Sequence, residues 1–286
     1  EGLQQLIQGG AEQAGLTAED VMEVVLVGNP VMHHLLLGID PIELGGAPFA
    51  LAVDTSTELR ADEINLALHK GSRVYVLPCI AGHVGADAAG VVLAEAPQTS
   101  DKISLLVDVG TNAEIVLGNQ DRMLAASSPT GPAFEGAQIS SGQRAAPGAI
   151  ERIRIDAETL EPRFAVIGSD IWSDQDGFDE AIKDTGITGI CGSGIIEVLG
   201  EMYLAGIISE DGVIDGALAE KTDRITEEGR TFSYRISDTV SVTQNDVRAI
   251  QLAKAALHAG FKLLMDKMEV PRVDRVVLAG AFGTHI

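Results

Sequence analysis

The sequence predicts an α/β protein of two lobes, with mixed sheets flanked by helices. Short apolar runs typical of buried strands alternate along the chain with segments of helical periodicity. The chain has 286 residues, of which 45% are hydrophobic. Since a domain commonly holds about 100–200 residues, we expect a first lobe over residues 1–97 and a second over residues 98–286, each with its own core.

The first lobe shows a helix, two strands and two further helices in its sequence pattern. We expect a helix over residues 3–14, a strand over 24–27, a strand over 74–77 and a small-residue helix that ends near residue 96. Between the strands, Asn29 suits an N-cap and Pro30 the first helical position. His33 and His34 follow on this helix without Cys or carboxylate at metal-ligand spacing, so we expect no metal there.

The second lobe is expected to begin with strands over 103–108, 113–117 and 122–126, the last two joined by a hairpin turn at 118–121. A glycine- and proline-rich stretch then leads to further strands, a helix, a long helix and a last strand, expected over residues 150–155, 164–167, 193–204, 247–264 and 275–278. Thr243 and Asp246 resemble a capping box at the start of the long helix.

The charge and hydropathy of the chain exclude several classes of protein. Lys and Arg number 20 against 42 Asp and Glu, which gives a net charge of −22. Nucleic acids and anionic membranes bind basic surfaces, so we expect neither as a partner. The most apolar stretch, residues 24–39, is interrupted by Gly28, Pro30 and two histidines, and no signal peptide is evident. We therefore expect a cytoplasmic protein.

The two cysteines, Cys79 and Cys191, lie far apart in the sequence. They exclude a disulfide framework and a Cys-ligated zinc or iron–sulfur site within this chain. Cys191 has no base near it in the sequence, so a small buried residue is a better interpretation than a nucleophile.

The motif with the clearest chemistry is Asp108-Val109-Gly110-Thr111-Asn112. An apolar strand brings a carboxylate to its end, a tight turn follows, and the chain returns as a strand. Glycine lets the backbone approach a polyphosphate, and successive N–H groups make an anion-binding concavity. Asp108 would then hold hydrated Mg²⁺. The alternative interpretation is an Asp- and Gly-rich hairpin without a ligand.

Three other glycine-rich segments could line a site. They are Gly131 to Glu135 in a long loop, Gly192-Ser193-Gly194 at a predicted helix start, and Gly280-Ala281 behind the last strand. A helix N-terminus suits an anion, and a small-residue turn admits a ring or ribose. Each segment alone is weak, because glycine also serves backbone packing, and Glu135 could equally be an N-cap or a loop brace.

The two ends of the sequence suggest a fragment. Residue 1 is Glu, and the sequence stops on Ala279–Ile286, a glycine turn directly behind an apolar strand. We expect the chain to be part of a larger protein.

The order of these motifs resembles one family, the ATP-dependent reductive activators of corrinoid proteins, whose nucleotide-binding region is similar to actin, sugar kinases and heat-shock chaperones. The resemblance covers nearly the whole chain and rests on Val27–Gly38, Gly82–Asp87, Asp108–Asn112, Gly131–Gly136, Gly189–Gly194, Thr243–Asp246 and Ala279–Gly283. Several matches in the same order are specific, whereas any one of them is not.

The resemblance implies a two-lobed, actin-like (ribonuclease-H-like) fold with ATP and Mg²⁺ in the cleft, and a truncated first lobe. Asp108 to Asn112 would match the second of two phosphate loops, and Leu278 to Ala281 the adenosine turn, with Ala281 where Gly is common. Gly131, Glu135, Gly192, Ser193 and Gly194 would line the nucleotide. The first phosphate loop is expected before Glu1, so this fragment should bind ATP weakly and be inactive.

The activity implied by the resemblance is the return of a Co(II) corrinoid to Co(I), driven by ATP, with electrons from an iron–sulfur domain absent from this chain. The partner would be the corrinoid protein of a methyltransferase system, and a homodimer is among the oligomeric states left open. Two alternatives stay open: a small-molecule kinase of the same superfamily, and a non-catalytic docking module for a corrinoid protein.

Overall fold

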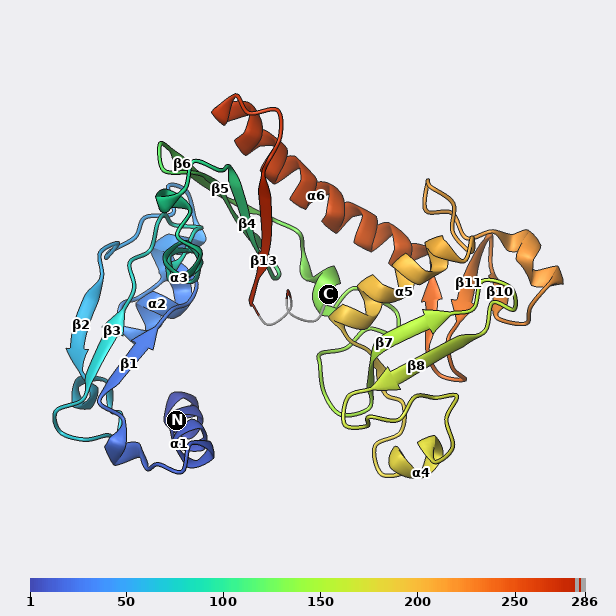
Figure 1. Ribbon diagram of the computed structural model, residues 1–286, viewed down its shortest axis with the longest axis horizontal. Helices are drawn as coiled ribbons and strands as arrows, with labels where there is room; N and C mark the ends of the chain where they lie inside the picture. Colours follow the sequence, from blue (N-terminus) through green and yellow to red (C-terminus); the bar gives the residue numbers. More distant parts are fainter. Residues whose placement is uncertain (281–282, 284–286) are drawn as a thin grey trace. The chain divides into compact units, whose positions relative to one another are not determined.

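The computed structural model describes residues 1–280 and Gly283, and the chain divides into two compact units (Figure 1). The first unit holds residues Glu1–Leu106, Glu114–Ser127 and Leu264–Val277; the second holds Val107–Ala113, Ser128–Leu263 and the residues from Leu278 on. In the described part of the chain, no helix has the length and apolarity needed to cross a bilayer.

A three-stranded sheet with order β1-β3-β2 forms the core of the first unit. β1 (Glu23–Leu26) runs parallel to β3 (Arg73–Val76), and β2 (Thr57–Arg60) pairs with β3 antiparallel. The first unit also contains helices α1 (Gly2–Gln13), α2 (Pro30–Leu36) and α3 (Ala86–Glu95). The strands and helices expected here from the sequence are confirmed, whereas β2 was not predicted, because its alternating charged residues leave only Leu59 and Thr57 facing inward.

Helix α2 begins as the sequence predicts. The Asn29 side chain accepts a hydrogen bond from the Met32 amide at 2.9 Å, and Pro30 is the first helical residue. His34 is buried and fully bonded: its Nδ1 lies 2.9 Å from the Pro30 carbonyl, and its Nε2 lies 3.0 Å from the Ala52 amide. His34 therefore joins α2 to the loop that follows it.

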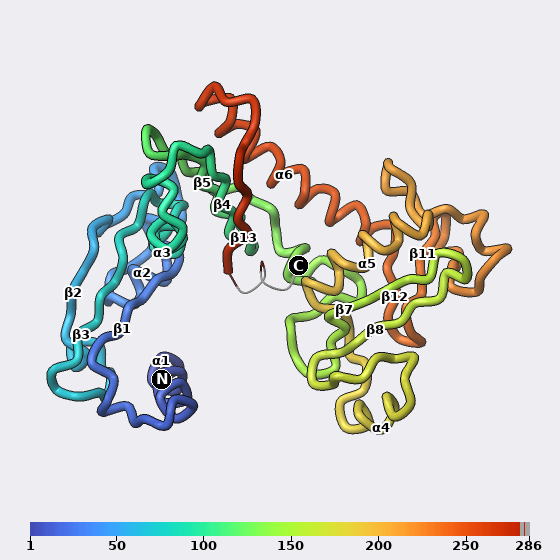
Figure 2. The backbone as a smooth tube through the Cα atoms, in the orientation of Figure 1, coloured from blue at the N-terminus to red at the C-terminus, as the bar shows by residue number. Residues whose placement is uncertain are grey.

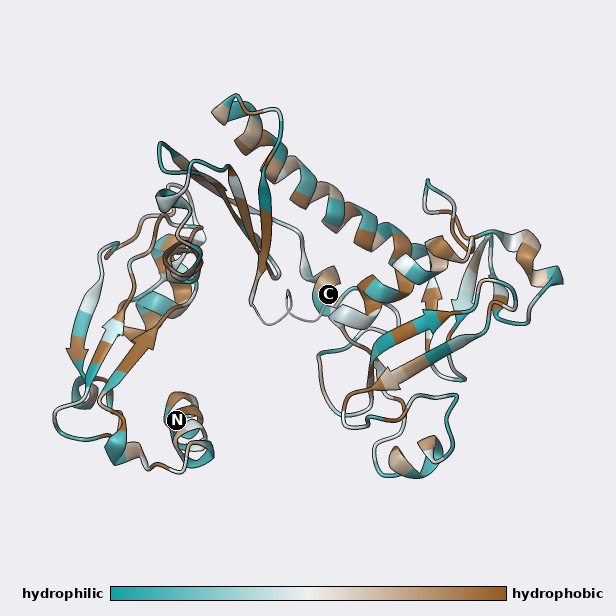
Figure 3. Ribbon diagram, in the orientation of Figure 1, coloured by the Kyte–Doolittle hydropathy of each residue, from teal (hydrophilic) through white to brown (hydrophobic). Residues whose placement is uncertain are grey.

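A second sheet has the order β13-β4-β5-β6. It consists of β13 (Arg275–Ala279), β4 (Ser104–Val109), β5 (Ala113–Gly118) and β6 (Met123–Ser128). β4 and β5 consist mostly of hydrophobic residues (Figure 3), and most of their side chains are buried. The predicted hairpin between β5 and β6 is confirmed, and the Asn119 amide donates to the Arg122 carbonyl across it.

Two small sheets lie in the second unit. One has the order β8-β7-β9, with β7 (Ala149–Ile155), β8 (Pro162–Val166) and β9 (Gly189–Ile190); the other has the order β10-β11-β12, with β10 (Ile225–Glu228), β11 (Thr231–Arg235) and β12 (Ser241–Thr243). The sequence did not predict β9 to β12. β9 and β12 are too short to show a period, and three of the four residues of β10 are exposed.

Helix α5 (Gly192–Leu204) packs against β7, and the long helix α6 (Gln244–Met268) leads back to β13, as Figure 2 shows in the red part of the trace. The predicted capping box at α6 is confirmed with Asp in place of Glu: Asp246 Oδ2 accepts from the Thr243 amide at 2.8 Å, and Thr243 Oγ1 accepts from the Asp246 amide at 3.2 Å. The remaining short helices are α4 (Phe178–Ala181) and the 3-10 turns η1 (Ala18–Asp20), η2 (Ile42–Gly45), η3 (Ala61–Ile64), η4 (Pro97–Thr99), η5 (Pro132–Glu135) and η6 (Gly216–Glu220).

Candidate functional site

The turn at the end of β4 has the strand–turn–strand form that the sequence predicts. Asp108 and Val109 close β4, residues 110–112 make the turn, and β5 begins at Ala113. Within the turn, the Gly110 amide donates to the Asn112 carbonyl at 3.0 Å. The carboxylate of Asp108 therefore stands where a buried strand ends.

Side chains from a distant loop hold this turn in place. Thr130 is buried, and its Oγ1 lies 2.9 Å from the Gly110 carbonyl and 3.1 Å from the Thr111 carbonyl. The Thr111 hydroxyl donates to Glu135 Oε1 at 2.8 Å. Both turn carbonyls and the Thr111 side chain are thus fixed by the loop that carries Gly131 to Glu135, the segment the sequence had connected with the same site.

Two glycines at the site have different surroundings. A Cβ added at Gly110 would lie 3.3 Å from the Asn112 carbonyl oxygen and 3.7 Å from Glu135 Oε1, so a side chain there would press on the turn itself. Gly280, in contrast, has a φ of +81°, and a Cβ there would lie 2.8 Å from Asp108 Oδ1. Only glycine allows the backbone behind β13 to lie this close to the Asp108 carboxylate.

The other predicted site residues of the loop, the turn and the adenosine segment have different positions. Gly131 has a φ of +73° and precedes η5, so its backbone conformation favours glycine. Ala281 lies outside the described residues. Asn112 is exposed beside Gly110. The structure thus brings Asp108, Gly110, Thr111, Asn112, Glu135 and Gly280 together.

The segment Gly192-Ser193-Gly194 serves packing in this structure. A Cβ at Gly194 would lie 2.4 Å from the Ile150 carbonyl oxygen, so the absent side chain lets α5 approach β7. The Ser193 hydroxyl lies 3.3 Å from the Cys191 thiol, which in turn lies 3.4 Å from the same carbonyl. A cofactor contact for these three residues stays a prediction, while the contact of Gly194 with the sheet explains the glycine.

Thr130 is a site residue that sequence reasoning missed. It lies between Pro129 and Gly131, in the glycine- and proline-rich loop that the sequence analysis connected with the site. A hydroxyl side chain in such a loop was the one signal in the sequence that could have identified it. Ser140, later in the same loop, donates through its amide and hydroxyl to Asp246 Oδ1 at 2.8 and 3.0 Å. This bond fixes the loop to the start of α6.

Metal ligands are sparse over the described residues, which contain no cluster of three or more His, Cys, Asp and Glu side chains. The turn offers the carboxylates of Asp108 and Glu135, and Thr111 already bonds to Glu135. One or two carboxylates with retained water molecules are the usual protein contribution to a Mg²⁺–nucleotide site. The residues present therefore fit Mg²⁺ held through water next to a polyphosphate.

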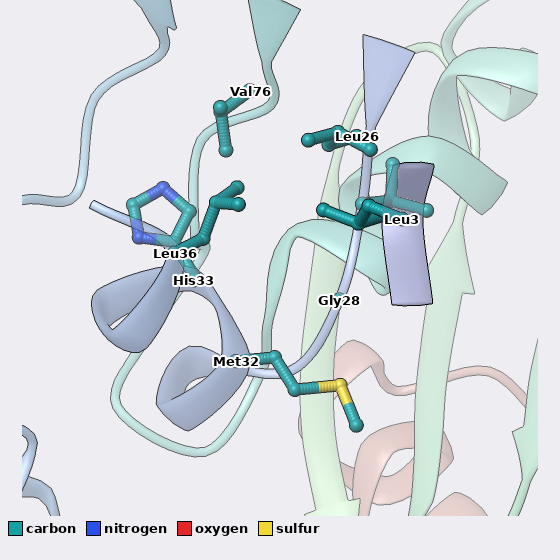
Figure 4. Close-up of a pocket in the computed structure, with 8 residues that line it drawn as sticks. Leu3, Leu26, Gly28, Met32, His33, Leu36 and Val76 are labelled. Atoms are coloured by element: carbon teal, nitrogen blue, oxygen red, sulfur yellow. The ribbon is translucent and has the colours of Figure 1, made fainter. Parts of the chain in front are cut away.

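A small cavity of about 240 Å³ in the first unit is lined by apolar side chains and by His33 (Figure 4). Figure 4 shows Met32 and Leu36 of α2 with Leu26 and Val76 of the strands. Both ring nitrogens of His33 are buried, and neither finds a hydrogen-bond partner within the described part of the chain. Burial lowers the pKa of His33, so the ring stays neutral around pH 7.

Two family models match the chain. Residues 1–99 match the RACo middle region, and residues 102–286 match the C-terminal domain of RACo, the ASKHA domain. The lobe boundary near residue 98 stays a prediction; residues 100 and 101 lie between the two matches. The interpretation of residues 1–97 as an incomplete first ATPase lobe stays a prediction, and the separate middle-region match gives those residues another place in the family.

Curated relatives and a solved structure agree with these matches. The corrinoid activation enzyme RamQ of Eubacterium limosum is 31% identical over 301 residues, covering 100% of this chain and 48% of RamQ. The Co(II) methylated amine-specific corrinoid protein reductase of Methanosarcina barkeri is 28% identical over 223 residues, covering 74% of this chain and 38% of the reductase. A solved reductive activator for corrinoid, iron–sulfur protein superposes with a TM-score of 0.79 at 32% identity, over 98% of this chain and 44% of that one.

This chain therefore spans less than half the length of each relative. The two family matches together cover nearly all of its residues, and the mixed α/β sheets agree with the ASKHA fold that the sequence led us to expect. The chain belongs to the RACo family, with a middle region followed by ASKHA-domain sequence.

Proposed function

We propose that this chain is the nucleotide-binding part of an ATP-dependent reductive activator, which returns Co(II) corrinoid proteins to Co(I). The single observation that carries the proposal is the turn after β4: a carboxylate at a strand end, exposed residues at Thr111 and Asn112, and a backbone fixed by Thr130. The names of the relatives supply the substrate class, a corrinoid protein. The corrinoid protein would belong to a methyltransferase system.

The turn's residues would divide the work of holding Mg²⁺ and ATP. Asp108 would orient a Mg²⁺-bound water, while the amides of Thr111 and Asn112 would face the phosphates; the Gly110 amide already donates to the Asn112 carbonyl. Glu135 holds Thr111 and so fixes the direction of the turn. When bound, Mg²⁺ would neutralise phosphate charge that the two nearby carboxylates otherwise repel.

The position of this turn in the ASKHA match bears on which phosphate loop it is. The match begins at residue 102, two residues before β4 starts at Ser104. Asp108 thus ends the first strand of the matched domain. This order favours the first phosphate loop over the second one that the resemblance implied, and it is part of our proposal.

Electrons for the corrinoid would come from an iron–sulfur domain outside residues 1–286. The sequence contains two cysteines, and both thiols are buried, whereas iron–sulfur clusters commonly require four thiolates. The role of this chain would be to bind ATP and bias a two-state complex with the corrinoid protein. We expect it to act in the cytoplasm.

The test is calorimetry of Mg-ATP binding, together with corrinoid reduction in the complete activator. Asp108→Ala should abolish ATP-dependent activation and weaken Mg-ATP binding while the fold persists, and removal of Mg²⁺ with EDTA should weaken binding by wild type far more than by the variant. Asp121→Ala, on the exposed β5–β6 hairpin, is the matched control and should behave as wild type.

Three outcomes would contradict the proposal. Unchanged Mg-ATP binding in Asp108→Ala would place the nucleotide elsewhere. Phosphate transfer to a small metabolite, without corrinoid reduction, would support the kinase alternative. Corrinoid-protein binding that is independent of ATP would support a docking module.

A further inference from the structure

A further cavity is lined by residues of the second unit, with none of the Asp108 turn residues among its lining. It has a volume of about 680 Å³ and lies between α5 and α6, with Phe134 of η5 among its lining residues. Pockets of about 300–1,000 Å³ are typical of sites for small organic molecules. The cavity is therefore large enough for a ligand of several rings.

The walls of this cavity are apolar and come from both helices. Ile196 and Leu199 line it from α5, and Val247 and Ile250 line it from α6. Gly200 also lines the cavity, directly after Leu199 on α5, and a Cβ added there would meet no atom within 4 Å. The missing side chain leaves a gap in the wall, and an aliphatic wall with such a gap suits a flat apolar body.

The polar side chains that line the cavity differ in whether they are already hydrogen-bonded. Gln251 is already bonded: its Oε1 accepts from Arg248 at 2.6 Å, and its Nε2 donates to the Asp211 carbonyl at 3.0 Å. Lys254 also lines the cavity, is exposed, and forms no hydrogen bond or ion pair within the described residues. Its ammonium group is therefore available to a ligand.

The position of Lys254 on α6 directs that charge over the apolar wall. Lys254 follows Val247 by seven residues and Ile250 by four, so all three lie on one face of the helix. A lysine stem covers apolar surface while its charge stays at the water boundary. Glu210 lines the cavity from the loop after α5 and carries the opposite charge.

We propose that the cavity between α5 and α6 binds a small planar apolar molecule carrying one anionic group, with the apolar body against Gly200 and the anion at Lys254. The site is separate from the Asp108 turn and does not depend on the function proposed for that turn. The cavity's size, its apolar walls and its unpaired ammonium group carry the inference.

The experiment is a fluorescence titration of the 286-residue chain with 8-anilinonaphthalene-1-sulfonate, an aromatic anion. Wild type should bind it with a defined saturable component. Gly200→Leu should lower the affinity of that component by about tenfold or more, because the leucine side chain would occupy the gap that glycine leaves in the cavity wall. Lys254→Gln should lower it by about threefold, as expected for loss of one exposed ion pair.

Three controls make the result interpretable. Gly9→Leu, on α1 with no atom near the added Cβ, should bind the probe as wild type does. Glu210→Gln should leave the affinity unchanged or raise it, since it removes a repelling carboxylate. Circular dichroism should show that each variant is folded, because partly unfolded chains also bind this probe.

The proposal is overturned if folded Gly200→Leu binds the probe as tightly as wild type, since the ligand would then lie elsewhere. It is also overturned if Glu210→Gln weakens binding while Lys254→Gln does not, because the site would then prefer a cation. Full displacement of the probe by Mg-ATP would show that the cavity belongs to the nucleotide site. If Gly200→Leu does not fold, the exposed Lys254→Gln variant decides the question.

Discussion

The turn after β4 and the segment that opens α5 both contain glycine, and the sequence assigned both to one cofactor, yet the structure gives Gly110 and Gly194 different surroundings. At Gly194 an added Cβ would lie 2.4 Å from the carbonyl oxygen of Ile150 on another element, whereas at Gly110 it would lie 3.3 Å from the Asn112 carbonyl oxygen of the same turn. The absence of a side chain at Gly194 thus allows close packing against the protein's own backbone. Gly110, in contrast, stands beside the exposed residues Thr111 and Asn112, where a ligand could approach. Glycine in a motif thus becomes informative only once its neighbours are known.

The largest effect on folding is expected at Gly194. Gly194→Ala should lower the free energy of unfolding by about 3 kcal/mol, because the new methyl group overlaps the Ile150 carbonyl and α5 must shift from β7. Chemical denaturation measures the change. The matched control is Gly200→Ala on the same helix, which has open space and should stabilise by about 0.5–1 kcal/mol. Equal stability of the two variants would remove the distinction drawn above.

Gly110→Val should give the opposite result to Gly194→Ala. Its free energy of unfolding should fall by only about 1 kcal/mol, since the side chain presses on the Asn112 carbonyl of an exposed turn. Mg-ATP affinity should fall by about tenfold or more, a loss of about 1.4 kcal/mol in binding. The valine side chain would stand beside Thr111 and Asn112, where we propose that the phosphates bind. Calorimetry and denaturation on the same sample separate the two effects. ATP binding at wild-type strength would show that this space is not used by the nucleotide.

Thr130→Val tests whether the brace, as well as the glycine, defines the turn. The change keeps the shape of a buried side chain but removes the hydroxyl that contacts the Gly110 and Thr111 carbonyls. We expect a loss of about 1–2 kcal/mol in stability and weaker Mg-ATP binding. Thr99→Val, which removes an exposed hydroxyl bonded to the Ala96 carbonyl, is the control and should change neither quantity by more than about 0.5 kcal/mol.

The smallest effect is expected at Ser193. Its hydroxyl contacts only the Cys191 thiol among the hydrogen bonds described for it, so Ser193→Ala should change stability by about 0.5 kcal/mol or less and leave Mg-ATP affinity unchanged. A clear loss of ATP affinity, measured by calorimetry, would show that the α5 segment also contacts the nucleotide. The contrast between the two segments would then fail.

The same contrast explains which features of the structure could be predicted from the sequence. The strand ending at Asp108, the hairpin at Asn119 and the cap at Asn29 all follow from local rules, because turn residues and caps act on neighbours within three or four positions. The brace by Thr130 joins residues 19 and 20 positions apart, and the contact of Gly194 with Ile150 spans more than 40. A single sequence carries no local signal for such contacts. The short strands β9 and β12 were missed for the same reason, since their pairing partners define them.

The four residues of η5 place two neighbouring side chains in different sites. Glu135 accepts the Thr111 hydroxyl at the turn, and Phe134, the preceding residue, lines the cavity between α5 and α6. A molecule that moves Phe134 acts on the same short backbone that positions Thr111. If the two sites are coupled in this way, the coupling is reciprocal: a cavity ligand that changes ATP affinity by some factor has its own affinity changed by ATP by that same factor. The affinity of the cavity between α5 and α6 for its ligand would then report whether ATP occupies the turn after β4.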